Sequence, residues 1–394
     1  MNYNQPLKNG STVTIRVMCA IVFVVFSFAW LYFFQADLLM MTQHVLSDGL
    51  TQYSPLTGAL LLTALLMVLQ LVIYALFKLK KRSHALTYVP SMLMLALITD
   101  VSQRINGDDM HPWSWFTPVV VIFVWLLLVG LAKLLQEIED DRDYGILSRP
   151  MWINMLLMSL QIMFVAWMGN TNAVFHYRMK VEGLLAEGRY EKALRVGQKS
   201  LESDRHLLML RMYALARENA LGERLFEYPI TGTSADILPT NGRTAMTFSP
   251  VDSLWRFLGA RPSQPMEPMY YLGLLESRNS TASSDSTASR TSVSPIADYR
   301  LCGLLIDREL DRFAREVQKY YQLDDRLPRH YREALVLYAH SRANPIVVYS
   351  HPVTEEDWRN LQELESQYPN ATERRVKVEE HYRGTYWYYY EYER

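Results

Sequence analysis

The sequence predicts an all-α fold in two parts, an N-terminal bundle of five transmembrane helices (1–169) and a C-terminal helical soluble domain (170–394). Apolar residues make up 49% of the 394 residues, yet nearly all long apolar runs lie before Asn170. Charge divides the opposite way, because residues 1–169 carry 10 Lys/Arg and 10 Asp/Glu whereas the remainder carries 30 and 31. After His176, apolar and charged residues alternate at helical spacing. The two parts therefore face different solvents.

Five apolar runs are predicted to cross a bilayer. A bilayer core of roughly 30 Å needs about 20 apolar residues in a helix, because backbone groups in lipid must bond within their own segment. The weakest run ends at Asp100 and contains Pro90, but 93–98 is unbroken apolar sequence and thinner membranes tolerate short spans. The first run lacks a small-x-small cleavage site, so we interpret it as a retained span. The five spans are 15–37, 56–77, 85–101, 115–135 and 151–169.

The distribution of Lys and Arg predicts the orientation, because basic links resist translocation. Two links are nearly free of basic residues and are therefore expected on the outer side. The link 38–55 holds no Lys or Arg, and the link 101–114 holds only Arg104. With five spans, the N-terminus is expected inside and everything after Asn170 outside. In a bacterium this means the inner membrane, with the C-terminal domain in the periplasm. The basic residues on the inner side are Lys8, Arg16, Lys78, Lys80, Lys81, Arg82, Lys133, Arg142 and Arg149.

The start of the soluble part, 170–277, is predicted to form helical hairpins and short helices. The segment 184–194 resembles the turn region of tetratricopeptide (TPR) repeats, where a Gly lets two antiparallel helices meet, an aromatic follows and a small Ala packs between them. Gly222 follows Gly188 by 34 residues, the period of that family. The match is partial, because Glu227 replaces the expected small residue and Arg205 stands where Pro is usual.

Two further regions complete the soluble part. Residues 278–296 are rich in Ser and Thr and almost without apolar residues, which predicts a flexible loop. Helical patterning resumes over 297–394, is broken at Leu327-Pro328, and continues in a helix from Thr354, taken as its N-cap, to Tyr368.

The closing segment, 382–392, places seven aromatic residues in eleven positions. One interpretation is that these rings pack into the last helical pair or seal the end of the repeat stack. A second is a platform for a ligand or peptide, since Tyr and Trp offer large rigid contact area at low entropy cost. A third is an aromatic anchor against lipid headgroups. The binding candidates are Tyr386, Trp387, Tyr388 and Tyr390.

The layout resembles an uncharacterised family of multi-pass inner-membrane proteins of the Bacteroidota. The resemblance rests on the segments 34–39 (FQADLL), 81–91 (KRSHALTYVPS), 327–334 (LPRHYREA) and 384–387 (GTYW). It implies the architecture and no activity. In that bacterial group, Asp285-Ser286-Thr287 resembles the short acceptor pattern for periplasmic O-glycosylation, so Ser286 is a modification candidate.

Candidates for chemistry are few. Asp37 falls in an outer link, as in membrane glycosyltransferases that use lipid-linked sugars, and Asp100 lies at the end of the short span, where a buried ionisable group faces a partner or a cavity. The amides of Gln70, Asn154 and Gln161 are expected to bond across helices. No His, Cys or phosphate-loop pattern predicts a metal or cofactor.

These observations favour a membrane-anchored scaffold that presents a helical-repeat domain to a protein, peptide or envelope ligand. Without a basic excess, nucleic acid is excluded as a partner. Cys19 lies within an apolar run and Cys302 lies far away in the polar half of the chain, so no disulfide is predicted. The alternative is a membrane enzyme or transporter subunit that acts on lipid-linked or sugar substrates through Asp37 or Asp100.

Overall fold

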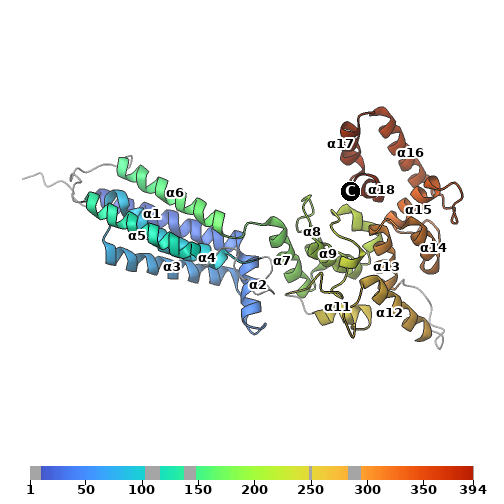
Figure 1. Ribbon diagram of the computed structural model, residues 1–394, viewed down its shortest axis with the longest axis horizontal. Coiled ribbons are helices and arrows are strands. Elements are labelled where there is room, and N and C mark those ends of the chain that lie inside the picture. The colour runs from blue at the N-terminus through green and yellow to red at the C-terminus, as the bar shows by residue number, and fades with distance from the viewer. Residues whose placement is uncertain (1–9, 103–115, 137–147, 248–250, 283–293, 394) are drawn as a thin grey trace, which may run out of the picture. The chain divides into compact units, whose positions relative to one another are not determined.

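The protein is all-α over the residues that the structure describes, and no strand occurs among them. It divides into two compact units, Met1–His176 and Tyr177–Arg394, so the division falls seven residues after the predicted boundary. Both cysteines are free and buried. The computed structural model, drawn in Figure 1, describes residues 10–102, 116–136, 148–247, 251–282 and 294–393.

Among the described residues of the first unit, four helices are long enough and apolar enough to cross a membrane, and they coincide with four of the predicted spans. Between 11% and 33% of each span is buried within the chain, so most of the apolar surface faces outward, as it does in a helix surrounded by lipid. The helices of this unit are α1 (Gly10–Ala29), α2 (Ala36–Leu46), α3 (Pro55–Phe77), α4 (Val89–Thr99), α5 (Phe116–Gln136) and α6 (Arg149–Met168).

A π-helical turn, η1 (Trp30–Phe34), extends α1 and ends it. The Gln35 N–H donates to the Trp30 carbonyl over 3.0 Å, five residues back, which is the hydrogen bond of a π-turn. After Gln35 the chain changes direction, and Figure 1 shows α2 turned away from the axis of α1. The first span therefore ends at the π-turn, and Asp37 lies in the first turn of α2.

The fifth predicted span, 85–101, is not one α-helix. It consists of the end of a 3-10 helix, η2 (Lys81–Tyr88), followed by α4, with Pro90 in the first turn of α4, where its missing N–H removes no helical hydrogen bond. Both elements pack against α3 and α6. Six of the eleven α4 residues are buried, so this segment lies inside the bundle, unlike the four long helices whose apolar surface faces outward.

Side chains from neighbouring helices complete the hydrogen bonding of η2. The Asn154 Oδ1 accepts from the Ala85 N–H over 2.7 Å, and the Gln161 Nε2 donates to the Ala85 carbonyl over 3.0 Å. The Gln70 Nε2 donates to the Thr87 hydroxyl over 3.0 Å. The expectation that these three amides bond across helices is confirmed.

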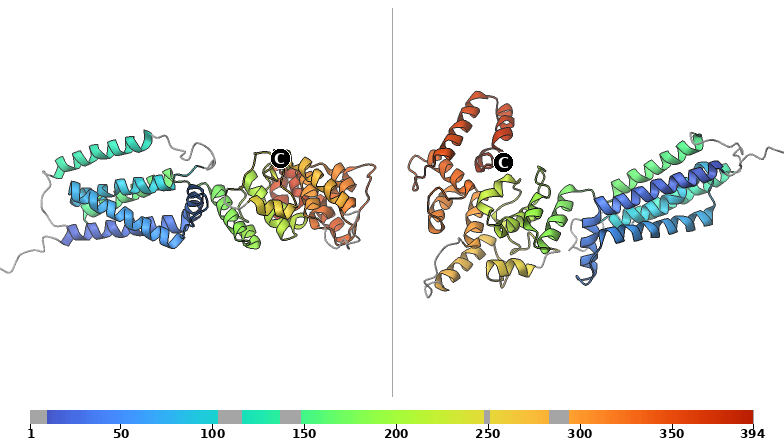
Figure 2. Two further views of the ribbon diagram at one scale, coloured as in Figure 1. Left: turned by 90° about the horizontal axis from the view of Figure 1, so that it is seen from below. Right: turned by 180° about the vertical axis from the view of Figure 1, so that it is seen from behind.

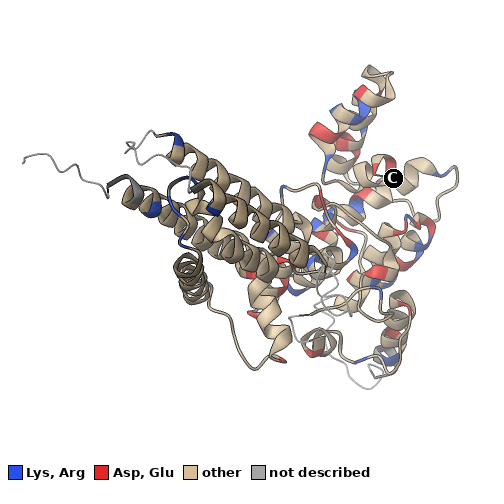
Figure 3. Ribbon diagram, turned by 60° about the vertical axis from the view of Figure 1, so that its left-hand side comes forward, with Lys and Arg blue, Asp and Glu red and all other residues tan. Residues whose placement is uncertain are grey.

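Basic residues gather at one end of the bundle, as Figure 3 shows. There the Arg16 guanidinium lies 4.4 Å from the Tyr74 ring centre, and the Lys133 Nζ lies 5.4 Å from that of Phe77, so α1 and α5 both bring a cation to the end of α3. At the opposite end, residues 35–55 contain Asp37 and Asp48 but no Lys or Arg.

The second unit is built around three buried helices, α9, α13 and α15, and its elements are visible from further sides in Figure 2. Gly222 lies close to α15, because a Cβ there would come within 2.6 Å of the Tyr331 ring. The elements are α7 (Ala173–Ala186), which begins in the first unit, α8 (Tyr190–Arg195), α9 (Arg205–Arg217), α10 (Leu221–Arg224), η3 (Leu225–Glu227), η4 (Ser234–Asp236), α11 (Val251–Leu258), α12 (Pro268–Ala282), α13 (Pro295–Ile306), α14 (Leu310–Tyr320), α15 (Arg329–Ser341), α16 (Pro352–Gln367), α17 (Ala371–Tyr382) and α18 (Tyr386–Tyr392).

The structure differs from the sequence predictions at three places in the second unit. Thr354 is not the N-cap of α16: His351 is, because its ring accepts from the Thr354 N–H and Pro352 opens the helix. Helix α12 continues to Ala282, five residues into the predicted loop. The turn at Gly188, with φ of 71°, is present, but α8 after it has only six residues.

Candidate functional site

The two aspartates singled out as catalytic candidates lie at the same end of the bundle. Asp37 is half-buried on α2, and Asp100 is fully buried directly after α4. Asn170 bonds to a neighbour of each aspartate. Its carbonyl accepts from the Gln35 side chain over 3.0 Å, and its side-chain amide donates to the Val101 carbonyl over 2.7 Å.

Further hydrogen bonds make this end of the bundle a closed polar cluster. The Asn170 N–H donates to the Thr99 carbonyl over 2.9 Å, and the His176 Nε2 lies 2.9 Å from the Asn170 carbonyl oxygen. Gly169 leaves room for these contacts, since a Cβ there would lie 2.8 Å from the Thr99 hydroxyl. The cluster holds the chain where it leaves the bundle. Among the described residues, no group of three His, Cys, Asp or Glu is placed to hold a metal ion.

The aromatic tail forms α18 and packs into the second unit. Tyr386, Trp387, Tyr388 and Tyr389 are all less than 7% exposed, and only Tyr390 of the four binding candidates is half-buried. The Thr385 hydroxyl caps the helix by accepting from the Tyr388 N–H over 3.2 Å. The hydroxyls of Tyr386 and Tyr389 donate to carbonyls at the end of α13 over 3.3 and 2.6 Å. These buried rings therefore pack against the rest of the second unit, as the first of the three interpretations expects.

A buried carboxylate, Glu333 on α15, anchors this tail. It accepts from the Tyr386 N–H over 2.7 Å, from the His330 Nδ1 over 3.0 Å and from the Arg329 Nε over 2.8 Å. The Trp387 indole donates to the Glu333 carbonyl over 2.8 Å. Burial raises the pKa of the Glu333 carboxyl, but the contacts with His330, Arg329 and the Tyr386 N–H outweigh it, so the pKa lies below its ordinary value.

His330 extends the network to a third segment. Its Nε2 accepts from the Phe226 N–H over 3.3 Å, so the ring proton sits on Nδ1 and faces Glu333. The Phe226 ring lies 5.0 Å from that of Tyr386 and 4.8 Å from that of Tyr389. The segment 225–227, α15 and α18 are therefore joined through one histidine and one carboxylate, and this network is structural.

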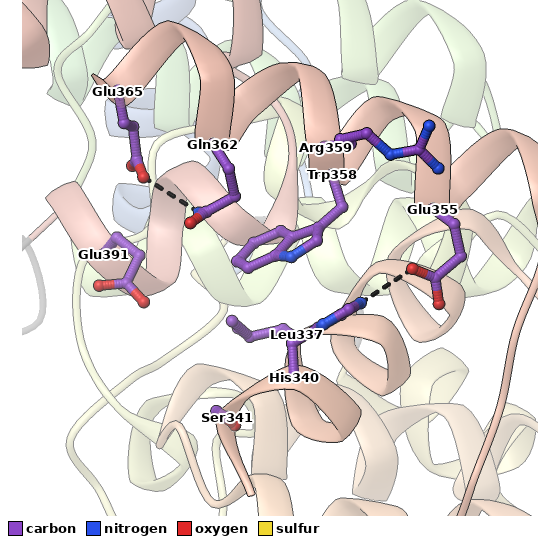
Figure 4. A pocket seen from close by; sticks show the side chains of 9 residues that line it. All are labelled: Leu337, His340, Ser341, Glu355, Trp358, Arg359, Gln362, Glu365 and Glu391. Carbon is purple, nitrogen blue, oxygen red and sulfur yellow. Dashed lines mark hydrogen bonds and ion pairs between the residues drawn. The ribbon is translucent and has the colours of Figure 1, made fainter. Parts of the chain in front are cut away.

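The second unit has an open cleft between α15, α16 and α18, which we call the Trp358 cleft. Its volume is about 690 Å³ and it is lined by Leu337, His340, Ser341, Glu355, Trp358, Arg359, Gln362, Glu365 and Glu391. Figure 4 shows the Trp358 ring in the middle, with Glu355 and Glu391 on opposite sides of it.

The geometry of the cleft fixes the indole and leaves acidic groups around it. The Trp358 ring packs edge-on against buried Trp387 at 5.3 Å and lies 5.9 Å from the His340 ring. The His340 Nε2 lies 2.8 Å from the Glu355 Oε2. Helix α16 contributes Glu355, Glu365 and one basic residue, Arg359, to the lining, and Glu391 of α18 adds a third carboxylate, so the cleft has an acidic lining.

The cleft was not predicted from the sequence. Glu355-Glu356-Asp357-Trp358 is an acidic run beside an aromatic residue, which is the only local signal for it. The structure brings that run beside His340 and Glu391, which come from distant parts of the chain. Ser286, the modification candidate, lies outside the described residues.

Comparison with known proteins gives one match. The profile of a family of unknown function, DUF6057, matches residues 106–260 and 285–393. No curated protein and no solved structure matches the chain.

Proposed function

The chain belongs to the DUF6057 family of unknown function, and from its own geometry we propose a membrane-anchored binding protein whose second unit holds a basic peptide segment of a partner in the Trp358 cleft. The observation that carries the proposal is an indole held in an open cleft with carboxylates on both sides. The tetratricopeptide-like region around Gly188 and Gly222 serves in this view as the scaffold that supports the cleft.

The charges of the cleft select a cationic ligand. Its lining contains three carboxylates and one guanidinium, so it attracts a positive group. The face of an indole binds Lys or Arg with about 0.5–2 kcal/mol, the larger value applying where water is excluded. A Lys or Arg side chain seated over Trp358 therefore has Glu355 and Glu391 within the same cleft as counter-charges.

Binding to full-length protein in nanodiscs tests this function, with acetyl-trilysine amide as the probe and titration calorimetry as the measurement. Trp358→Leu, which removes the aromatic face, is expected to weaken binding by about two- to thirtyfold. Glu355→Gln combined with Glu391→Gln is expected to weaken it and flatten its salt dependence, whereas Glu363→Gln, an exposed position on α16 outside the cleft, should leave it unchanged. Binding of a chito-oligosaccharide in place of the peptide, or equal affinity in all variants, would overturn the proposal.

The cleft faces the outside of the cell if the bundle crosses the membrane five times. Six residues of η2 after the basic pair Lys81 and Arg82, at the 3-10 rise of about 2.0 Å, and eleven of α4, at the α-helical rise of about 1.5 Å, make this segment roughly 28 Å long. This length matches a bilayer core of roughly 30 Å, although α4 alone does not. We therefore propose η2–α4 as the fifth crossing, at the centre of the bundle.

The basic end of the bundle belongs on the cytoplasmic side, since Lys and Arg resist translocation. In a bacterial inner membrane, five crossings then place the second unit in the periplasm. Reporter fusions test this: a fusion after Lys80 is expected inside, and fusions after Ser102 and after Arg394 are expected outside. A fusion after Ser102 that reports from the cytoplasm would show that η2–α4 does not cross, and the location of the second unit would be reversed.

A membrane enzyme or transporter subunit is the second candidate, and the complete burial of Asp100 at the end of the bundle favours it. A buried carboxylate that is kept for function commonly lowers the stability of the fold, whereas one that is kept for structure raises it. Asp100→Asn in the full chain therefore separates the two. A rise in melting temperature supports a functional role, and a fall corresponding to about 1–3 kcal/mol supports a structural one.

A further inference from the structure

A second cavity lies in the first unit, at the end of the bundle opposite the basic residues. Its volume is about 820 Å³, within the usual range for small-molecule sites. It is enclosed by α2, the link 47–54, the first turns of α3 and the end of α4. Because α3 is one of the helices that can cross a membrane, the cavity lies where a span meets the bilayer surface.

The lining changes from polar to apolar in the direction of the bilayer. Fifteen residues form it, none of them charged. The polar ones come from α2, the link and the first turn of α3, and include Thr42, Gln52 and Thr57. Deeper along α3 and α4 the lining is Leu61, Leu62, Leu97 and Ile98, and Leu39 and Leu46 of α2 and Val101 after α4 are also apolar. A ligand that fits has an apolar chain at one end and uncharged polar atoms at the other.

One group in the polar part is an unused hydrogen-bond donor. The Tyr53 hydroxyl is shielded by the fold and makes no hydrogen bond to any described residue. Its ring is pressed onto Gly58, where a Cβ would lie 2.2 Å from the ring. The Tyr53 ring lies against α3 as part of the cavity wall, so a turn of the ring toward the cavity would give its hydroxyl the acceptor that a buried hydroxyl calls for.

We propose that this cavity holds one acyl chain of a membrane glycerophospholipid, with the ester group facing Tyr53 and the polar side chains of the link. An ester carbonyl is the uncharged acceptor that the hydroxyl requires, and it directly precedes the chain. The charged phosphate stays outside, because no residue of the lining can neutralise it. A polyprenyl phosphate fits less well, because it has no uncharged polar group between its hydrocarbon and its phosphate.

Native mass spectrometry of the full chain tests the site after exchange into dipalmitoylphosphatidylcholine and detergent. Leu61 and Leu65 lie one turn apart on α3 and are 57% and 58% exposed, but only Leu61 lines the cavity. The wild type and Leu65→Trp are expected to retain one lipid, and Leu61→Trp to retain it about tenfold less. Tyr53→Phe is expected to lower retention by about two- to tenfold, as for loss of one neutral hydrogen bond.

The same experiment with other lipids tests whether the bound molecule is a diester glycerophospholipid. The dialkyl ether analogue, which lacks the ester carbonyls, is expected to be retained less than the diester, and Tyr53→Phe should abolish this difference. Equal retention of the lipid by Leu61→Trp and the wild type, with both proteins monodisperse and equally thermostable, would show surface lipid only. Displacement of the diester by a polyprenyl phosphate would reject the ester assignment.

Discussion

Glu333→Gln is expected to release the aromatic tail from the second unit. The Tyr386 N–H and the His330 Nδ1 share one carboxylate oxygen of Glu333, and the Arg329 Nε uses the other. The amide oxygen of the variant can still accept from the two buried donors, but without its charge, and the NH₂ group then faces Arg329. Hydrogen bonds to a charged group contribute about 1.5–3 kcal/mol and neutral ones about 0.5–1.5 kcal/mol, so the two buried bonds together lose about 1–3 kcal/mol. Loss of the charge on the bond from Arg329 adds about 1 kcal/mol, a small value because that side chain is 41% exposed.

The expected loss of about 2–4 kcal/mol corresponds to a fall in melting temperature of about 4–16 °C for a unit of this size. The assay is thermal unfolding of the full chain in detergent, with Glu356→Gln, an exposed change of the same kind, as control. Because the pKa of Glu333 is lowered in the folded state, its stabilisation is present above the ordinary glutamate pKa and is lost as pH falls through the folded value. The cost of the variant should therefore shrink below roughly pH 4.

Hydrogen exchange locates the effect. The Tyr386 N–H donates to Glu333, so its protection should fall in Glu333→Gln more than that of amides in α9. A variant that melts within about 2 °C of the wild type, with the Tyr386 amide still protected, would refute the claim that this carboxylate holds the tail.

Three further substitutions test the packing and electrostatics of the two units. Gly222→Ala should cost about 1–3 kcal/mol in thermal unfolding because its Cβ meets the Tyr331 ring, whereas Gly130→Ala, with open space around it, should be neutral or stabilising. Asp298 accepts from the hydroxyls of Tyr321 and Tyr331, and burial raises its pKa, so native stability falls as pH rises from the ordinary aspartate pKa through the folded value. Melting curves at pH 4 and pH 7 should therefore show Asp298→Asn gaining on the wild type at the higher pH. Asn154→Leu leaves the Ala85 N–H without its acceptor and should lower the melting temperature of the bundle, whereas Ser159→Ala, at an exposed position on α6, should not.

The sequence was sufficient for those parts of the fold that follow from local pattern. Hydropathy located four long apolar helices, and Leu327-Pro328 correctly placed a break before α15, but the helical periodicity did not reveal the further break between α13 and α14. The prediction of Thr354 as the N-cap of α16 was wrong, because Pro352 starts the helix two residues earlier. His351 supplies the capping acceptor, a role that Ser, Thr, Asp and Asn fill more often.

The Trp358 cleft escaped prediction because its members come from three helices that meet only in the folded chain. His340 lies in the last turn of α15, Trp358 on α16 and Glu391 on α18. The aromatic tail attracted attention by its density, but density does not distinguish rings that are buried from rings that bind. What decides is Glu333, an unremarkable acidic residue in the sequence whose hydrogen bonds turn Tyr386 and Trp387 inward.

The short fifth segment shows why hydropathy alone cannot settle the number of crossings. An isolated eleven-residue α-helix is too short for the bilayer, and a 3-10 helix has poorer backbone hydrogen bonds that lipid cannot compensate. Asn154 and Gln161 supply the missing partners from α6, and the Trp125 indole donates to the Leu86 carbonyl over 2.8 Å from α5. Crossing by η2–α4 therefore depends on the other helices being present. In the proposed five-crossing topology, the side of the membrane on which the second unit lies depends on three polar side chains inside the bundle as well as on the basic links outside it.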